Sequence, residues 1–129
     1  MTSLILDTNT LLRFLLADIP SQYKKARATF SEIESGRKVG DISILVINET
    51  IWALDKFYDK PIAEAVSVVQ KLLSLKNIKI LEIEKKELVQ ILNNTIKYKI
   101  DFTDAYLLWI GKKEDHKIST FDKKLQALI

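Results

Sequence analysis

The sequence predicts an α/β fold in which a central parallel sheet is flanked by helices in three layers. Short apolar runs with the length of buried strands alternate with longer segments whose apolar residues recur at helical spacing. Strands that alternate with helices form parallel sheets with both faces covered. Neither an internal repeat nor a low-complexity stretch interrupts the pattern. We therefore expect a single domain over residues 1–129, with a sheet of four or five strands.

Four segments are expected to form strands, and helices are expected between and after them. The expected strands are residues 3–6, 38–43, 77–82 and 117–119. The expected helices cover residues 11–16, 20–35, 46–58, 61–73, 88–96, 102–113 and 121–128. Pro20 and Pro61 stand where a helix begins, and Gly36 stands where one ends, as is usual for these residue types.

Composition excludes several kinds of catalytic site. The absence of cysteine rules out disulfides, thiolate metal sites and a cysteine nucleophile. The one histidine, His116, rules out a multi-histidine zinc site, and we expect it at a helix end. The net charge of +3 permits contact with nucleic acid without arguing for it. No apolar run is long enough to cross a membrane and no signal peptide is recognised, so we expect a cytoplasmic protein.

Four acidic residues occupy positions from which they could share one site. Asp7 ends the first expected strand, and Asp122 follows the fourth. Glu49 is expected in the first turn of the helix after the second strand, and Asp104 in the first turn of the helix that Asp101 opens. Open parallel sheets bind ligands beyond the carboxyl ends of their strands. We therefore expect these four carboxylates to gather at that edge.

A cluster of four carboxylates needs a cation to offset the repulsion between its charges. Oxygen ligands without cysteine or histidine suit the hard ions Mg²⁺ and Mn²⁺. Such an ion lowers the pKa of a bound water and stabilises a leaving oxygen, which suits phosphodiester hydrolysis without a protein nucleophile. Mg²⁺ or Mn²⁺ is therefore the expected cofactor.

Four acidic segments follow one another along nearly the whole chain. They read Leu-Ile-Leu-Asp-Thr-Asn-Thr-Leu-Leu-Arg at 4–13, Asn-Glu-Thr-Ile-Trp-Ala-Leu at 48–54, Asp-Phe-Thr-Asp-Ala-Tyr-Leu at 101–107 and Ser-Thr-Phe-Asp at 119–122. Any one segment is a weak signal, but four in order resemble the acidic motifs of PIN domains. The likeness is greatest to the VapC-type toxins of toxin–antitoxin pairs.

The resemblance implies a Mg²⁺-dependent endoribonuclease that acts on RNA, forms a homodimer and is inhibited by a small antitoxin. In the family's pattern, the metal-site acids are Asp7, Glu49, Asp104 and Asp122, and the supporting polar residues are Asn9 and Thr120. Family members usually continue past the fourth motif into a last strand, whereas this sequence stops at Ile129. That departure would leave the corner around Asp122 looser than usual.

Each acid also has a structural interpretation. Asp7 could cap the first helix, and Glu49 could interact with a helix dipole. Asp101 and Asp104 together resemble a capping box, and capping is sufficient to explain Asp101.

The other polar and aromatic residues are open to similar alternatives. Asn9 and Thr120 could be turn residues. Arg13 either contacts phosphate or is an ion-paired surface residue. Trp52 and Trp109 are expected in the core or at a dimer contact rather than stacked on bases.

Three functions compete, and a metal-dependent ribonuclease is favoured. A regulatory receiver domain would need a phospho-acceptor aspartate at the end of a middle strand, but residues 82–84 read Glu-Ile-Glu. A catalytically inactive PIN-like scaffold that only binds protein or RNA is the main alternative, although all four acids are present.

Overall fold

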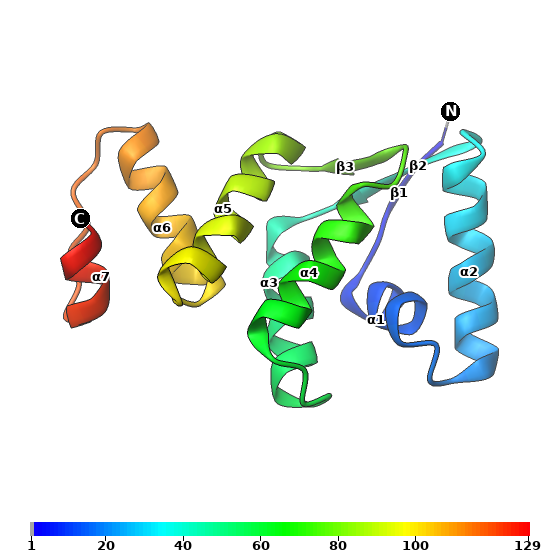
Figure 1. The fold of residues 1–129 in the computed structure, drawn as a ribbon. Coiled ribbons are helices and arrows are strands. Elements are labelled where there is room, and N and C mark those ends of the chain that lie inside the picture. Colours follow the sequence, from blue (N-terminus) through cyan, green and yellow to red (C-terminus); the bar gives the residue numbers. More distant parts are fainter. Residues whose placement is uncertain (1) are drawn as a thin grey trace. The chain divides into compact units, whose positions relative to one another are not determined.

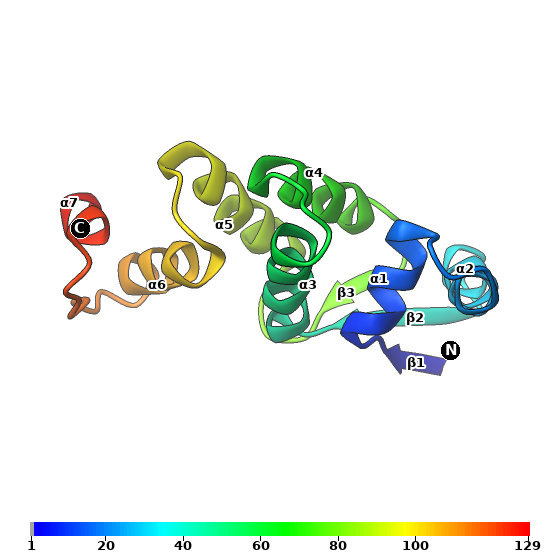
Figure 2. The ribbon, with the colours of Figure 1, turned by 90° about the horizontal axis from the view of Figure 1, so that it is seen from below.

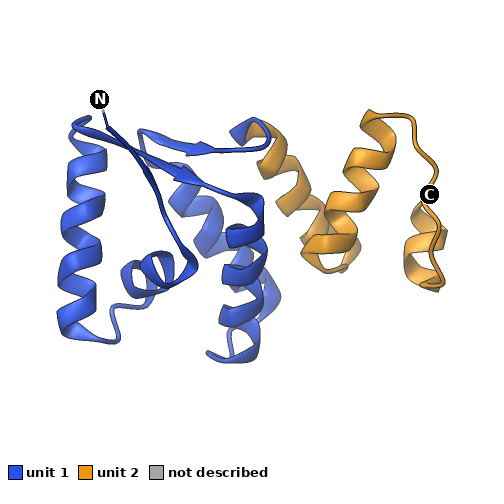
Figure 3. Ribbon diagram, turned by 180° about the vertical axis from the view of Figure 1, so that it is seen from behind, with its two compact units in different colours: residues 1–85 blue, residues 86–129 orange. Residues whose placement is uncertain are grey.

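The computed structural model describes residues 2–129, which form two compact units (Figure 3). The first unit ends at Lys85 and the second begins at Lys86. The first unit contains the whole sheet and four helices, and the second is helical. The prediction of a single domain stays a prediction.

The first unit alternates strands and helices along the chain (Figure 1). Its elements are β1 (Thr2–Ile5), α1 (Thr8–Leu16), α2 (Pro20–Glu34), β2 (Lys38–Ile42), α3 (Ile44–Lys56), α4 (Ile62–Leu73) and β3 (Ile78–Ile80). The second unit is made of α5 (Lys85–Tyr98), which starts at the last residue of the first unit, α6 (Phe102–Lys113) and α7 (Lys123–Leu128).

The sheet is parallel throughout, in the order β1-β2-β3. Both crossovers step in the same direction across the sheet, so right-handed connections place α1 to α4 on one face. α1 lies between α2 and α3 (Figure 2). On the covered face, Gly40 is in register with Leu4 and Ile78. A Cβ at Gly40 would lie 2.8 Å from Ile33 Cδ1, so a larger residue there would force the end of that side chain to move.

Burial alternates along β3, as this one-sided packing requires, whereas in β2 the adjacent Val39 and Gly40 are both buried. Ile42, Ile78 and Ile80 are buried against the helices, whereas Ile5 is 75% exposed. The helices complete this core with buried apolar residues that include Leu11, Leu12, Phe30, Ile33, Ile47, Leu54, Val66 and Val69. The connections from β1 to α1 and from β2 to α3 therefore leave a tightly packed sheet. This packing fixes where the two helices begin.

The predicted fold class, a parallel sheet flanked by helices, is confirmed. Each predicted helix is present, α6 with the predicted ends and the others with ends shifted by one to three residues. One predicted strand is wrong, because residues 117–119 form no strand in the described chain, where the sheet has three strands. Lys117 and Ser119 are exposed, and the segment follows a turn in which the His116 amide donates to the Gly111 carbonyl at 2.8 Å. Three residues with one partly buried side chain offer too little apolar contact to hold a strand. Within residues 2–129, none of the helices has the length and apolarity needed to span a membrane.

Candidate active site

Asp7 stands where β1 turns into α1. The amide of the preceding Leu6 donates to the Asp41 carbonyl at 2.9 Å, which continues the sheet to the residue before Asp7. Asp7 is the N-cap of α1, and its Oδ1 accepts a hydrogen bond from the Thr10 amide at 2.8 Å. This bond satisfies one of the free amides of the first turn and holds the exposed carboxylate at the positive end of the helix.

Glu49 lies on α3 and is tied to α1. The Thr8 hydroxyl donates a hydrogen bond to Glu49 Oε1, which joins the start of α1 to the second turn of α3. The prediction that Glu49 occupies the first turn is wrong, because α3 begins at Ile44 and its first turn contains no acidic residue. A dipole-satisfying role in that turn is therefore excluded for Glu49.

α3 begins earlier than predicted because a residue that follows β3 holds its start. Ser43 caps the helix by accepting from the Leu45 amide at 3.1 Å. Glu82, just after β3, accepts from the Ser43 hydroxyl at 2.5 Å and from the Ile44 amide at 2.8 Å. These bonds satisfy orphan donors at the helix start and let it begin two residues before the predicted Val46.

A pocket of about 670 Å³ opens between α1 and α3, and the two predicted metal-site acids of this unit, Asp7 and Glu49, both line it. It is lined by Asp7, Thr8, Asn9, Leu12, Arg13, Val46, Glu49, Trp52, Ala53, Phe57 and Tyr58. The supporting residue Asn9 is exposed and lies in this lining. The pocket thus combines two acids, one cation and three aromatic rings.

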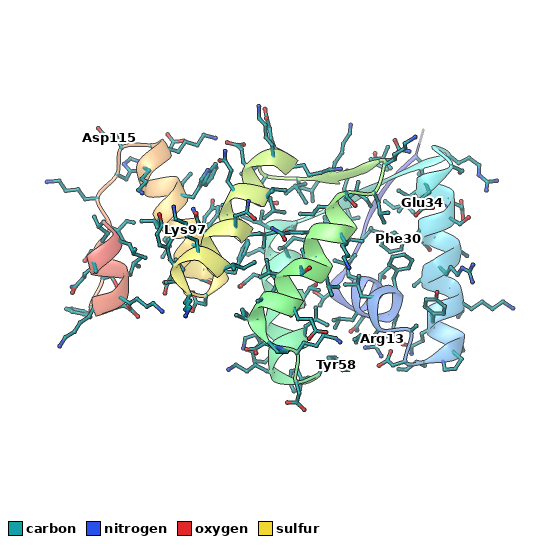
Figure 4. The ribbon with its side chains drawn as sticks, in the orientation of Figure 1. Arg13, Phe30, Glu34, Tyr58, Lys97 and Asp115 are labelled. Atoms are coloured by element: carbon teal, nitrogen blue, oxygen red, sulfur yellow. The ribbon has the colours of Figure 1, made fainter. Side chains whose placement is uncertain are left out.

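Arg13 lines this pocket and is held by two partners. Its Nη2 donates to the Tyr58 hydroxyl at 2.8 Å, and its Nη1 lies 3.4 Å from Asp18 Oδ1 (Figure 4). The Arg13 side chain is only 12% exposed. Arg13 is thus ion-paired, as one sequence-based interpretation expected, and a contact with phosphate stays a prediction.

A second groove borders Asp7 on its other side. The groove is lined by residues from two segments. They are Asp7, Asn9, Thr10 and Arg13 near the N-terminus and Gln22, Lys25, Ala26 and Thr29 of α2. Asp7, Asn9 and Arg13 line both this groove and the larger pocket. The Asp7 carboxylate therefore stands between a pocket with aromatic rings and a polar groove that contains a lysine.

The second unit brings Asp104 near two other acids. Asp101 caps α6 by accepting from the Asp104 amide at 2.9 Å, as the capping interpretation expected. Asp122 caps α7 in the same way, through the Leu125 amide at 2.9 Å. Burial raises the pKa of Asp104, and the charges of Asp101 and Asp122 raise it further, as does a side-chain hydrogen bond to Asp101.

Thr120 serves as a turn residue beside Asp122. Its hydroxyl accepts from the Asp122 amide at 3.0 Å, and its carbonyl accepts from the Gln126 side chain at 2.7 Å. These bonds fix the turn that leads into α7. They agree with the structural interpretation of Thr120 and leave its role near a metal a prediction.

The donor chemistry of each unit fits a hard divalent cation. Asp7 and Glu49 share a pocket with Thr8 and Asn9. The pKa of Asp104 is raised first by burial and then by the charges of Asp101 and Asp122, and a cation would offset those charges. Over residues 2–129, no group of three or more histidine, cysteine or acidic side chains is close enough to hold a metal ion. Each unit supplies one pair of the predicted acids.

Several pocket residues were not predicted. Thr8 could have been suspected from its place between Asp7 and Asn9, but Tyr58 carries no local signal. Glu82, which lies outside the pocket and holds the start of α3, carries none either. Trp52 was expected in the core or at a dimer contact; the core interpretation is wrong, because the side chain is 52% exposed at the pocket. Trp109 is partly buried, with the Lys113 ammonium 4.8 Å from its ring centroid.

Comparison with known proteins gave one family. The family model for the PIN domain matches residues 4–128, which is nearly the whole chain. No curated protein matches the sequence significantly.

Proposed function

The chain belongs to the PIN-domain family, and on that premise we propose that it is a Mg²⁺- or Mn²⁺-dependent endoribonuclease and the toxin of a type II toxin–antitoxin pair. PIN domains are typically nucleases, and they generally use divalent metal ions. The observation that carries the proposal is the pocket shared by Asp7 and Glu49, in which the Thr8 hydroxyl orients the Glu49 carboxylate.

We propose that the metal ligands are Asp7, Glu49, Asp104 and Asp122, with Asn9 and Thr120 as supporting residues. A bound divalent ion would lower the pKa of a water and offset the negative charge of the phosphate. The chain's own part is to hold its carboxylates in place. The Thr10 amide fixes Asp7, the Thr8 hydroxyl fixes Glu49, and the start of α7 fixes Asp122. Such preset ligands reduce the rearrangement needed when substrate binds.

The test is cleavage of a single-stranded RNA with added Mg²⁺ or Mn²⁺, with EDTA, and with three variants. We expect EDTA to abolish cleavage, and Glu49→Gln to reduce it severely because a ligand is lost. Thr8→Val should reduce cleavage about 10- to 100-fold, as is typical when a residue that orients a metal ligand is removed. The matched control is Glu64→Gln, an exposed acid in the first turn of α4 that does not line the pocket. Cleavage that persists in EDTA would refute the proposal.

A catalytically inactive PIN-like scaffold is the second candidate. It is favoured by the absence, over residues 2–129, of three acidic side chains close enough for one ion. The same assay separates the two functions, because a scaffold would bind RNA or a protein without metal-dependent cleavage. Retention of RNA by the chain in a filter assay without any cleaved product would select the scaffold.

The proposal extends to partners and location. A toxin of this kind acts on RNA in the cytoplasm, is held inactive by an antitoxin, and works as a homodimer. A pocket with two carboxylates can receive an arginine, whose planar fork pairs both oxygens of a carboxylate. We therefore propose that the antitoxin places an arginine beside Asp7 and Glu49. An antitoxin that inhibits cleavage without weakening metal binding would contradict this.

A further inference from the structure

Three aromatic side chains stand beside the carboxylates without being buried. Trp52 is 52% exposed, Phe57 is 68% exposed and Tyr58 is 36% exposed, and all three line the pocket that contains Asp7 and Glu49. Trp52 and Phe57 meet edge to face, with ring centroids 5.2 Å apart. Burying such rings in the core would be favourable, so leaving them at a polar pocket requires an explanation.

Contacts limit the movement of these rings: Arg13 holds Tyr58, and Trp52 and Phe57 pack against each other. Trp52 is on α3, one turn beyond Glu49, whose side chain the Thr8 hydroxyl holds. The Tyr58 hydroxyl accepts from Arg13, and Asp18 holds the other end of the guanidinium. Preset aromatic side chains lose little conformational freedom when a flat ligand stacks on them.

The charges around the rings point to nucleic acid. On the far side of Asp7, the groove formed with α2 contains Lys25 and shares Arg13 with the pocket. An RNA strand that crosses the Asp7 carboxylate would thus pass from aromatic rings to a lysine. This order matches a nucleotide, which has a flat base on one side and charged phosphates along its backbone.

We propose that the base of an RNA nucleotide next to the cut phosphate stacks on Trp52, with Phe57 at its edge, while the following phosphate pairs with Lys25. The inference rests on the proposed nuclease function, and it adds the residues that hold the substrate. Stacking uses the flat face that every base has, so binding requires a base at this position and tolerates a change in its identity.

The test combines kinetics with fluorescence. Trp52→Ala should raise KM for a single-stranded RNA by about 5- to 150-fold, which is the usual effect of removing one base-stacking ring, with little change in kcat. Trp52→Phe should recover most of the loss because it keeps an aromatic face. The control is Leu45→Ala, an apolar residue of α3 that is 74% exposed and does not line the pocket; it should leave KM unchanged. Lys25→Ala should make binding less dependent on salt, whereas Trp52→Ala should not.

Fluorescence reports binding without catalysis. The chain has two tryptophans, so Trp109→Phe leaves Trp52 as the only one. In EDTA, titration with the RNA should quench this fluorescence, and an RNA that lacks one base at the bound position should quench it less.

Each result has one meaning. Wild-type cleavage with an unchanged KM for Trp52→Ala would overturn the stacking inference and leave the nuclease function standing. Quenching in EDTA without any cleavage in Mg²⁺ would overturn the nuclease function; it would support the stacking of a base on Trp52 and overturn its placement next to a cut phosphate. The inference would also be overturned by two results together: Trp52→Ala changes the protein from dimer to monomer in light scattering, and RNA does not quench the protein whose only tryptophan is Trp52. Those results would assign the ring to a contact between copies of the chain.

Discussion

The substitution Asp104→Asn tests whether Asp104 is a metal ligand or a structural residue. It can do so because the Asp104 side chain is not the group that caps α6. The cap is Asp101, which accepts from the backbone amide of residue 104, and asparagine keeps that amide. The substitution removes a carboxylate whose pKa is raised by burial and then by the charges of Asp101 and Asp122. Without metal, the variant should therefore melt at the wild-type temperature or higher.

The size of each effect follows from these interactions. Like charges three or four residues apart on a helix cost roughly 0.2–0.5 kcal/mol, and Asp122 adds a second repulsion, so the metal-free variant should gain up to about 1 kcal/mol. A gain of that size raises Tm by about 3–5 °C in a chain of this length. With metal at 100 times its Kd, binding stabilises the wild type by about 2.7 kcal/mol; a tenfold weaker variant keeps about 1.4 kcal/mol. The Mg²⁺-induced rise in Tm should thus fall by roughly half.

The assay is a set of melting curves with and without Mg²⁺, combined with RNA cleavage. Asp101→Ala serves as the control: it loses the α6 cap and about 0.5–2 kcal/mol of stability, but it should keep its Mg²⁺ shift. Asp104→Asn should keep its fold and lose cleavage. The reasoning is refuted if Asp104→Asn melts lower without metal yet keeps the full Mg²⁺ shift and its activity.

Three further outcomes are expected. The pKa of Asp104 is raised on folding, so the free energy of unfolding of the metal-free protein should fall as pH rises from 3.8 through that raised pKa. Melting curves at several pH values should show that Asp104→Asn removes this part of the fall. Gly40→Ala should cost about 1 kcal/mol in denaturant unfolding, because the ends of the Ile33 and Ile78 side chains must move away from the added Cβ; an unchanged midpoint would contradict this close packing. Light scattering should give twice the mass of the chain, whereas a monomer mass at high concentration would exclude the dimer.

Most of the fold could be predicted because its signals are local. The helix α2 begins at Pro20 and ends before Gly36, whose φ of 85° suits glycine. The start of α3 could not be predicted, since the Ile44 amide is held by Glu82, which is 38 residues away. The expected strand at 117–119 was inferred from a short β-like run, and local pattern alone does not supply a pairing partner.

The candidate site was predictable in part. Asp7 and Glu49 do share one pocket, although Glu49 reaches it from the second turn of α3. The position of Trp52 could have been read from helical geometry. It follows the buried Ile51 directly, so it points about 100° away from Ile51 and further away from Ile47 and Leu54 of the same buried stripe. The Arg13–Tyr58 bond joins residues 45 apart and has no local signal.

Three of the four proposed metal-site motifs have an aspartate that also starts a helix: Asp7 for α1, Asp101 for α6 and Asp122 for α7. Asparagine and serine serve almost as well at such a position, but they bring no negative charge. A lineage that no longer needed the nuclease could therefore replace Asp7 or Asp122 by one of these residues and keep its fold. Inactive descendants of this chain should carry asparagine or serine there more often than alanine, and a survey of related genomes can count them.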